Sequence, residues 1–232
     1  MRTIKRLSYE LNKGKYQKII DSVKAYCLEK DKWLLFLQKQ ENLHLTNSDR
    51  KIRDALIKEE YSSLFGLQAR AWKQALTDAC ETMHRYWCAI LESIRNAIYK
   101  RFTDDEQIHY AYALIKSEKN PKLYNNLSDI LHGKIIELKS HKLSKAKKLE
   151  VIKYLMRKIK RARGNYPRVK LFRSCRLDSG MHSVEEKSIN QRADDLHFAS
   201  DYRQYASVST LESGKRISLP LIGYEGLTKV IG

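Results

Sequence analysis

Residues 139–176 read KSHKLSKAKKLEVIKYLMRKIKRARGNYPRVKLFRSCR, and they carry most of the positive charge of the chain. The stretch holds fifteen Lys or Arg residues and one acid, Glu150, so its formal net charge is +14 against +18 for the whole protein. Its apolar residues recur every three or four positions, which predicts a helix with one apolar stripe and otherwise basic faces. Gly164 is expected to end this helix, and Pro167 to set an extended exit into a strand, VKLFRSC.

A basic helix that leads into a basic strand is typical of a surface that follows a phosphate backbone. The side chains predicted to contact an RNA or DNA backbone are Lys153, Arg157, Lys158, Lys160, Arg161, Arg163, Arg168, Lys170 and Arg173. Tyr166 lies among basic residues at the end of the helix, and we predict that it stacks on a base. Two other interpretations stay open: a solvated Lys-rich helix, and a helix on a membrane surface, although the apolar stripe lacks Trp and Phe.

The composition of the 232 residues indicates a soluble, polar protein with an anionic partner. The mean hydropathy is −0.59 and the isoelectric point is about 9.7. The longest apolar run, residues 33–37, is far too short to cross a membrane, and the N-terminus lacks the apolar segment of a signal peptide. Four cysteines without CxxC spacing indicate reduced thiols, as in a cytoplasmic protein.

Helical periodicity dominates the first 165 residues, and short alternating segments dominate the rest. Helices are predicted over residues 16–39, 49–60, 64–101, 104–117, 121–132 and about 143–163. Strands are predicted at residues 2–11 and in the segments VKLFRSCRL, DLHFAS, YASVST and RISLPLI. We therefore expect an α+β fold in which an N-terminal strand and the C-terminal strands form a small β-barrel, interrupted by a large helical insertion.

Catalytic and metal-binding patterns are missing from the sequence. No phosphate-binding P-loop and no GxSxG nucleophile elbow is present, and the acid clusters fit helix starts or loops. Cys80, His84 and Cys88 recur every four residues, but on a helix the two cysteines lie about 12 Å apart and cannot share one zinc with the histidine. We predict no catalytic residue, no metal ligand and no cofactor in this chain.

Three segments, in this order, resemble the N-terminal half of the TnpB (OrfB-type) proteins, which are transposon-encoded RNA-guided nucleases related to type V CRISPR effectors. The first, LFGLQARAWKQALTDACETMHRYW at 64–87, is similar to the family's S-x-x-LQ helix. The second, YPRVKLFR at 166–173, is similar to its F-P-x-F-K/R run. The third, KRISLPLIG at 215–223, is similar to its strand of the form L-x-L-P-x-L-G.

The resemblance implies a β-barrel wedge domain and a helical recognition lobe. Residues 1–14 would supply the first wedge strand, residues 15–165 the helical lobe and residues 166–232 the remainder of the barrel. In the family these parts hold the scaffold RNA and the guide–target heteroduplex, and they read a short motif beside the target. Residues 94–163 form a longer helical insertion than compact members carry, and its role does not transfer by motif.

The match to the LQ helix also assigns roles to individual residues. Phe65 and Gln68 fall where relatives approach the motif duplex, and Lys73 would lie near the backbone of that duplex. A glutamine side chain is also chemically suited to the edge of adenine. The resemblance therefore implies that these three residues read the target-adjacent motif.

The chain ends at Gly232, where the family's RuvC-like nuclease domain would begin, so we do not expect this chain alone to cut DNA. The expected function is that of an RNA-guided DNA-targeting module whose partners are a guide or scaffold RNA, target DNA and, in one version, a separate RuvC-like nuclease chain. Mg²⁺ would be needed only by such a nuclease domain. The expected location is the cytoplasm, in association with the nucleoid when the module is on its target.

Two alternatives stay open. The protein could be a guide-independent DNA-binding accessory protein of a transposon. It could instead be a helical interaction protein whose basic face meets an acidic protein partner.

Overall fold

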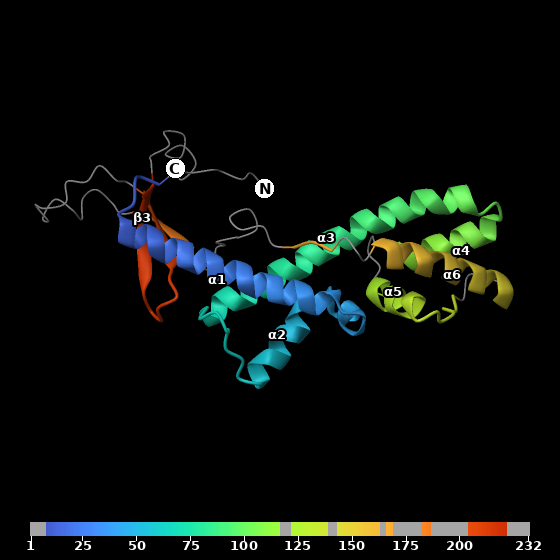
Figure 1. Ribbon diagram of the computed structural model, residues 1–232, viewed down its shortest axis with the longest axis horizontal. Coiled ribbons are helices and arrows are strands. Elements are labelled where there is room, and N and C mark those ends of the chain that lie inside the picture. The colour runs from blue at the N-terminus through green and yellow to red at the C-terminus, as the bar shows by residue number, and fades with distance from the viewer. Residues whose placement is uncertain are drawn as a thin grey trace, which may run out of the picture. The chain divides into compact units, whose positions relative to one another are not determined.

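The computed structural model consists mostly of helices in the part of the chain that it describes (Figure 1). The described residues are 8–116, 122–138, 143–162, 166–168, 182–186 and 204–221. The helices are α1 (Lys13–Gln38), the 3-10 helix η1 (Gln40–Leu45), α2 (Asp49–Lys58), α3 (Ala69–Arg101), α4 (Asp105–Ile115), α5 (Leu123–Leu131) and α6 (Lys145–Ala162). The strands are β1 (His182–Glu186), β2 (Gln204–Ser209) and β3 (Arg216–Leu221).

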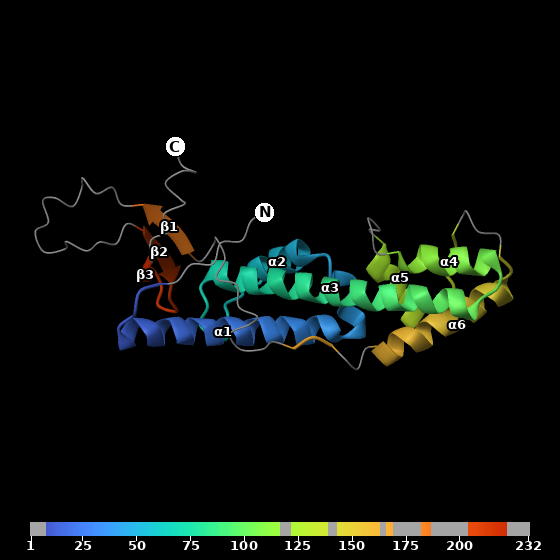
Figure 2. The same ribbon diagram turned by 90° about the horizontal axis from the view of Figure 1, so that it is seen from above.

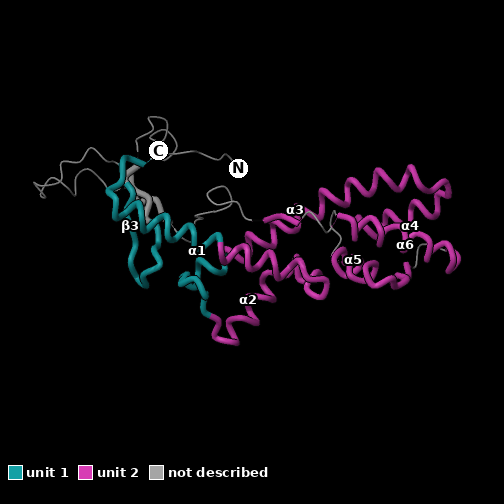
Figure 3. Tube along the Cα trace, in the orientation of Figure 1, with its two compact units in different colours: residues 1–27, 62–74, 171–232 teal, residues 28–61, 75–170 magenta. Residues whose placement is uncertain are grey.

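The chain forms two compact units, and each is built from separated stretches of sequence (Figure 3). Unit 1 comprises Met1–Cys27, Ser62–Gln74 and Leu171–Gly232. Unit 2 comprises Leu28–Tyr61 and Ala75–Lys170. Helices α1 and α3 pass from one unit into the other.

The strands of unit 1 form an open antiparallel sheet in the order β1-β2-β3. Val208 on β2 pairs with Ile217 on β3, and both side chains are buried. The turn between these strands includes Gly214, whose φ of 72° lies in the left-handed region that glycine adopts without a steric penalty. The Thr210 hydroxyl donates to the Lys215 carbonyl at 3.0 Å and holds the turn closed.

The predicted α+β fold with a closed β-barrel is wrong. Among the described residues the strands make an open sheet whose outer strands, β1 and β3, do not pair with each other, and helices predominate. The strands predicted at YASVST and RISLPLI are confirmed as β2 and β3. Of the predicted N-terminal strand, only residues 8–11 are described, and they contain a single bridge residue at Ser8. The predicted strands VKLFRSCRL and DLHFAS lie outside the described residues.

The predicted helices are confirmed, with differences at their ends. Helix α3 begins at Ala69 and not at residue 64, because Gly66 adopts a φ of 73° in the preceding loop. Helix α4 is capped by Asp104, whose carboxylate accepts the Glu106 backbone N–H at 3.0 Å. An aspartate at this position satisfies an amide left free at the helix start and opposes the positive end of the helix dipole.

The core of unit 2 lies between α3 and the helices that follow it, and Figure 2 shows α4, α5 and α6 beside the second half of α3. Helices α4, α5 and α6 pack against one another, and α5 also packs against η1. The fully buried apolar side chains of this core include Trp87, Leu91, Ile98, Tyr110, Leu114, Leu127, Ile130, Val151, Ile152, Leu155 and Ile159. No described helix is long and apolar enough to span a membrane.

Two tyrosine hydroxyls join α3 to α6 at separate points. Tyr86 on α3 donates to the carbonyl of Ala162 at 2.6 Å, and Tyr154 on α6 donates to the carbonyl of Ala97 at 3.0 Å. Because the later residue of α3 meets the earlier residue of α6, these helices run antiparallel. The two bonds fix which face of α6 is turned toward α3, and therefore which face is turned to the solvent.

A Tyr86→Phe substitution tests this connection. Loss of the hydroxyl leaves the Ala162 carbonyl without that donor, so we expect the free energy of unfolding to fall by about 0.5–1.5 kcal/mol. Urea denaturation measures the change, and hydrogen exchange should become faster in the last turn of α6. The exposed Tyr16→Phe is the matched control, and an equal effect of both substitutions would contradict the connection.

A second prediction concerns Glu212 in the β2–β3 turn, whose carboxylate pairs with Lys18 at 2.9 Å and Lys215 at 2.6 Å. Hydrogen bonds from these two ammonium groups lower the pKa of Glu212 from 4.5 to about 2. Because the pKa is lower in the folded state, the stabilisation is present above pH 4.5 and is lost as the pH falls through about 2. The melting temperature of the protein should exceed that of Glu212→Gln near neutral pH, and the difference should vanish near pH 2. A difference that does not depend on pH would contradict this assignment.

Candidate nucleic-acid interface

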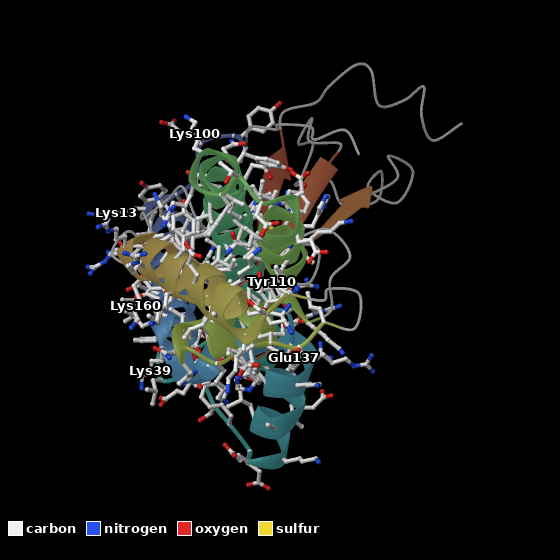
Figure 4. The ribbon with its side chains drawn as sticks, turned by 90° about the vertical axis from the view of Figure 1, so that its right-hand side faces the viewer. Lys13, Lys39, Lys100, Tyr110, Glu137 and Lys160 are labelled. Carbon is white, nitrogen blue, oxygen red and sulfur yellow. The ribbon has the colours of Figure 1, made fainter. Side chains whose placement is uncertain are left out.

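Helix α6 separates its apolar and basic side chains by face. Its buried residues Val151, Ile152, Leu155 and Ile159 recur at helical spacing and enter the core of unit 2. Lys153, Arg157, Lys160 and Arg161 are exposed on the remaining surface, and Lys158 is half-buried. Figure 4 shows Lys160 on the outer side of this helix. The segregation follows from the sequence, since burial of the apolar stripe leaves the basic residues in water.

Two of the three lysines in the first turn of α6 pair with carboxylates, whereas the cations toward its end do not. Lys147 pairs with Asp104 at 2.6 Å, and Lys148 pairs with Glu137 at 2.5 Å. The hydrogen bond between Lys147 and Asp104 raises the pKa of the lysine and lowers that of the aspartate. Within the part of the chain that the structure describes, no carboxylate pairs with any of the later cations, Lys153, Arg157, Lys158, Lys160 and Arg161.

Four cations surround a small surface pocket between the end of α3 and the second half of α6. The pocket has a volume of about 190 Å³ and is lined by Arg101, Tyr154, Arg157, Lys158 and Arg161; we call it the α6 pocket. The four α6 residues lie at positions i, i+3, i+4 and i+7 of one helical face. Arg101 comes from the last turn of α3 and bonds to Glu150 at 3.3 Å.

Tyr154 forms the uncharged wall of the α6 pocket. Its ring packs edge-on against Phe102 at 5.3 Å between centroids, and the Lys158 Nζ lies 5.6 Å from the Tyr154 ring centroid. Burial raises the pKa of the Tyr154 hydroxyl, and the positive charges of Arg101 and Arg157 oppose that rise. Because the phenol stays protonated near neutral pH, every charged group that lines the α6 pocket is a cation.

The structure brings only some of the predicted backbone-contacting residues together. Arg157, Lys158 and Arg161 line the α6 pocket, whereas Lys153 and Lys160 lie on the same helix outside its lining. Arg168 is exposed, and the predictions for Arg163, Lys170 and Arg173 lie outside the described residues. Sequence reasoning missed Arg101 and Tyr154 as parts of one site, because only the packing of α3 against α6 places them together.

Tyr166, predicted to stack on a base, packs against aromatic side chains of α3. Its ring centroid lies 5.2 Å from that of Tyr86 and 6.0 Å from that of Trp87. Tyr166 is half-buried, so part of its surface already serves packing inside unit 2. Its role in stacking stays a prediction.

Gln68, predicted to read a target-adjacent motif, holds the β2–β3 turn of unit 1. Its side-chain amide donates to the carbonyl of Thr210 at 2.8 Å and to that of Glu212 at 3.0 Å. Both amide hydrogens are therefore used inside the protein, and contact with an adenine edge through this amide would first have to break these bonds. Sequence reasoning missed this role because the partners lie more than 140 residues later in the chain.

The other two predicted motif-reading residues are half-buried. Phe65 lies in the loop before α3, where its backbone N–H donates to the Ser63 hydroxyl at 3.2 Å. The Lys73 Nζ lies 5.6 Å from the Trp72 ring centroid. Their contacts to DNA stay predictions.

A second pocket of unit 2 has a different chemical character. It has a volume of about 230 Å³ and is lined by Thr46, Asn47, Asp49, Thr77, Cys80, Glu81 and His84. His84 bonds through Nδ1 to the Tyr124 hydroxyl at 2.7 Å, and burial raises the pKa of the Cys80 thiol to about 12. No group of three or more His, Cys, Asp or Glu side chains that could hold a metal occurs among the described residues. With acids in its lining and a protonated thiol, this pocket is a poor site for a phosphate.

No family model, curated protein or solved structure matches the chain. The likeness to TnpB-type proteins therefore depends on the three motifs alone. The charges and contacts of α6 define the candidate interface.

Gln68→Ala tests the turn-anchoring role of Gln68. Loss of two hydrogen bonds should lower the free energy of unfolding by about 1–3 kcal/mol and speed hydrogen exchange at residues 204–221. Gln74→Ala, six residues later on α3, is the matched control, since the Gln74 side chain makes no hydrogen bond to the described residues. If Gln68→Ala changes neither stability nor exchange, the hydrogen bonds to the turn do not hold it.

Proposed function

We propose that the protein binds nucleic acid through the exposed basic side chains of α6. The single observation that carries this proposal is the α6 pocket, where three arginines and one lysine converge without a carboxylate in the lining. Arginine forks match the geometry of phosphate oxygens, and clustered cations displace the counterions of a nucleic acid when they bind it. The formal charge of +18 favours the same kind of partner.

Local helix electrostatics do not account for this cluster. The dipole of α6 stabilises each cation in the last turn by about 0.3–1 kcal/mol, and this effect accounts for Lys160 and Arg161. Arg157 and Lys158 lie one turn earlier, and the Arg157–Arg161 pair at i, i+4 costs about 0.2–0.5 kcal/mol. An anionic partner would offset this repulsion, whereas a helix that only meets solvent gains nothing from it.

We further propose that this binding serves an RNA-guided DNA-targeting module of the TnpB type. The support is the resemblance of the three segments at 64–87, 166–173 and 215–223. In such a module the guide RNA reads sequence by base pairing, while the protein supplies backbone contacts. On this proposal the α6 surface contacts an RNA or its heteroduplex, and a nuclease domain or a partner chain performs any cleavage.

The experiment uses the full chain freed of copurified nucleic acid by nuclease treatment and high salt. Fluorescence anisotropy then compares binding to a structured RNA, a single-stranded RNA and a DNA duplex over a range of salt concentrations. RNA binding with a steep salt dependence supports the guided module. Stronger binding to a defined DNA duplex would favour the guide-independent transposon accessory protein, and no binding to any nucleic acid at low salt would overturn the proposed function.

The triple variant Lys158→Gln/Lys160→Gln/Arg161→Gln should weaken binding to all RNA sequences alike. The slope of log K against log salt should become shallower by up to about 2, because each lost phosphate contact contributes about 0.7 for single strands. The matched control, Lys24→Gln/Lys51→Gln/Lys58→Gln, removes the same charge from exposed positions on α1 and α2. An equal loss in both variants would show that only net charge matters and would contradict a binding surface on α6.

A further inference from the structure

The α6 pocket is too small for a nucleotide and has the charge to hold a phosphate. Its volume of about 190 Å³ is below the roughly 300 Å³ at which pockets for drug-sized ligands begin. A base with its sugar therefore does not fit inside, but a phosphate group does. Tyr154 cannot offer its hydroxyl to such a ligand without breaking its bond to Ala97, so the donors are the guanidinium and ammonium groups.

The donors come from two helices and surround the pocket. Arg157, Lys158 and Arg161 lie on one face of α6, and Arg101 approaches from the end of α3. The Arg101 guanidinium bonds to Glu150, which also accepts from Gln107 Nε2 at 3.2 Å, so this arginine is held in place by groups outside the pocket lining. The Arg157 Nε donates to the Lys153 carbonyl at 3.4 Å, which leaves its two terminal nitrogens for a ligand.

The charge balance distinguishes between two kinds of phosphate. A phosphodiester inside a strand carries one negative charge, whereas a phosphomonoester carries about −1.5 to −2 near neutral pH. Four cations line the pocket, and one of them shares its charge with Glu150, so about three positive charges remain. A terminal phosphate neutralises more of this charge than an internal one, and it needs only one exit for the strand.

We propose that the α6 pocket binds a phosphomonoester at the end of a nucleic-acid strand. This inference rests on the proposed nucleic-acid function and adds a preference for one strand end. Two further exposed cations of α6, Lys153 and Lys160, contact internal phosphates of the same strand. The protein should therefore distinguish strands of identical sequence by the phosphorylation of their ends.

The test measures binding of the full chain to three RNAs of one sequence, with a 5′-phosphate, with a 3′-phosphate or with hydroxyls at both ends. We expect one phosphorylated form to bind about tenfold more tightly than the hydroxyl form, because charge-assisted hydrogen bonds to the extra charge are lost without it. The favoured form shows which end the pocket takes. Equal binding of all three RNAs would overturn this inference and leave the proposed function intact, whereas no binding to RNA or to DNA would overturn the proposed function itself.

Paired variants locate the effect. Arg157→Gln/Arg161→Gln should abolish the preference for a phosphorylated end, while Lys153→Gln/Lys160→Gln, with the same change of charge on the same helix, should weaken binding to all three RNAs and keep the preference. Arg157→Lys/Arg161→Lys retains the charge. This variant should keep only part of the preference for a phosphorylated end, since lysine lacks the forked guanidinium group. Loss of the preference in both glutamine variants would contradict the pocket assignment.

Competition with inorganic phosphate distinguishes a pocket for the phosphate at a strand end from a pocket for free phosphate. Millimolar phosphate should compete with the end-phosphorylated RNA only weakly, because the strand adds contacts outside the pocket. If phosphate alone raises the melting temperature of the protein and fully displaces the RNA at that concentration, the pocket serves a free phosphate and the strand-end proposal is wrong. Circular dichroism confirms that each variant is folded, and the replaced arginines and lysines are all exposed.

Discussion

The hydrogen bonds from Tyr86 and Tyr154 determine how the basic surface of unit 2 is presented. They join α3 and α6 at two points, so α6 can neither slide along nor rotate against its neighbour without breaking one of them. The buried residues of α6 require the same orientation, because their stripe must face the core. Apolar burial supplies most of the stabilisation, and the two hydroxyls select one register. The position of Arg101 beside Arg157 and Arg161 follows from that register.

Most helices could be predicted from the sequence because their signals are local. The spacing of apolar residues predicted α1 through α6, and only helix ends such as Asp104 and Ala69 differed. The closed barrel failed for a physical reason: alternation shows that a segment forms a strand, but closure depends on pairing between segments far apart in the chain. The same limit applies to the candidate site. Arg157, Lys158 and Arg161 could be predicted from helical charge, whereas Arg101 joins them only through the tertiary packing.

Gln68 shows why a residue carried over from a motif needs a structural test. The resemblance to the LQ helix puts Gln68 where relatives approach the motif duplex, which implies contact with DNA. In this structure its amide donates to two carbonyls of the β2–β3 turn, of which that of Glu212 also accepts the Lys215 backbone N–H at 3.1 Å. The glutamine therefore links the start of α3 to the turn of the sheet in unit 1, while its contact with DNA stays a prediction.

The division of the chain into interleaved units has a consequence for synthesis on the ribosome. Unit 2 ends at Lys170, so all of its parts have been translated before any of the last stretch of unit 1, Leu171–Gly232, has been made. Folding during translation generally begins with the N-terminal parts of the chain, while the ribosome adds about 5–20 residues per second. The basic face of α6 can therefore form on a nascent chain that is still held on the ribosome, close to ribosomal RNA. Lys18 on α1 pairs with Glu212 in the β2–β3 turn, and at that rate of synthesis this partner is made roughly 10–40 s after Lys18.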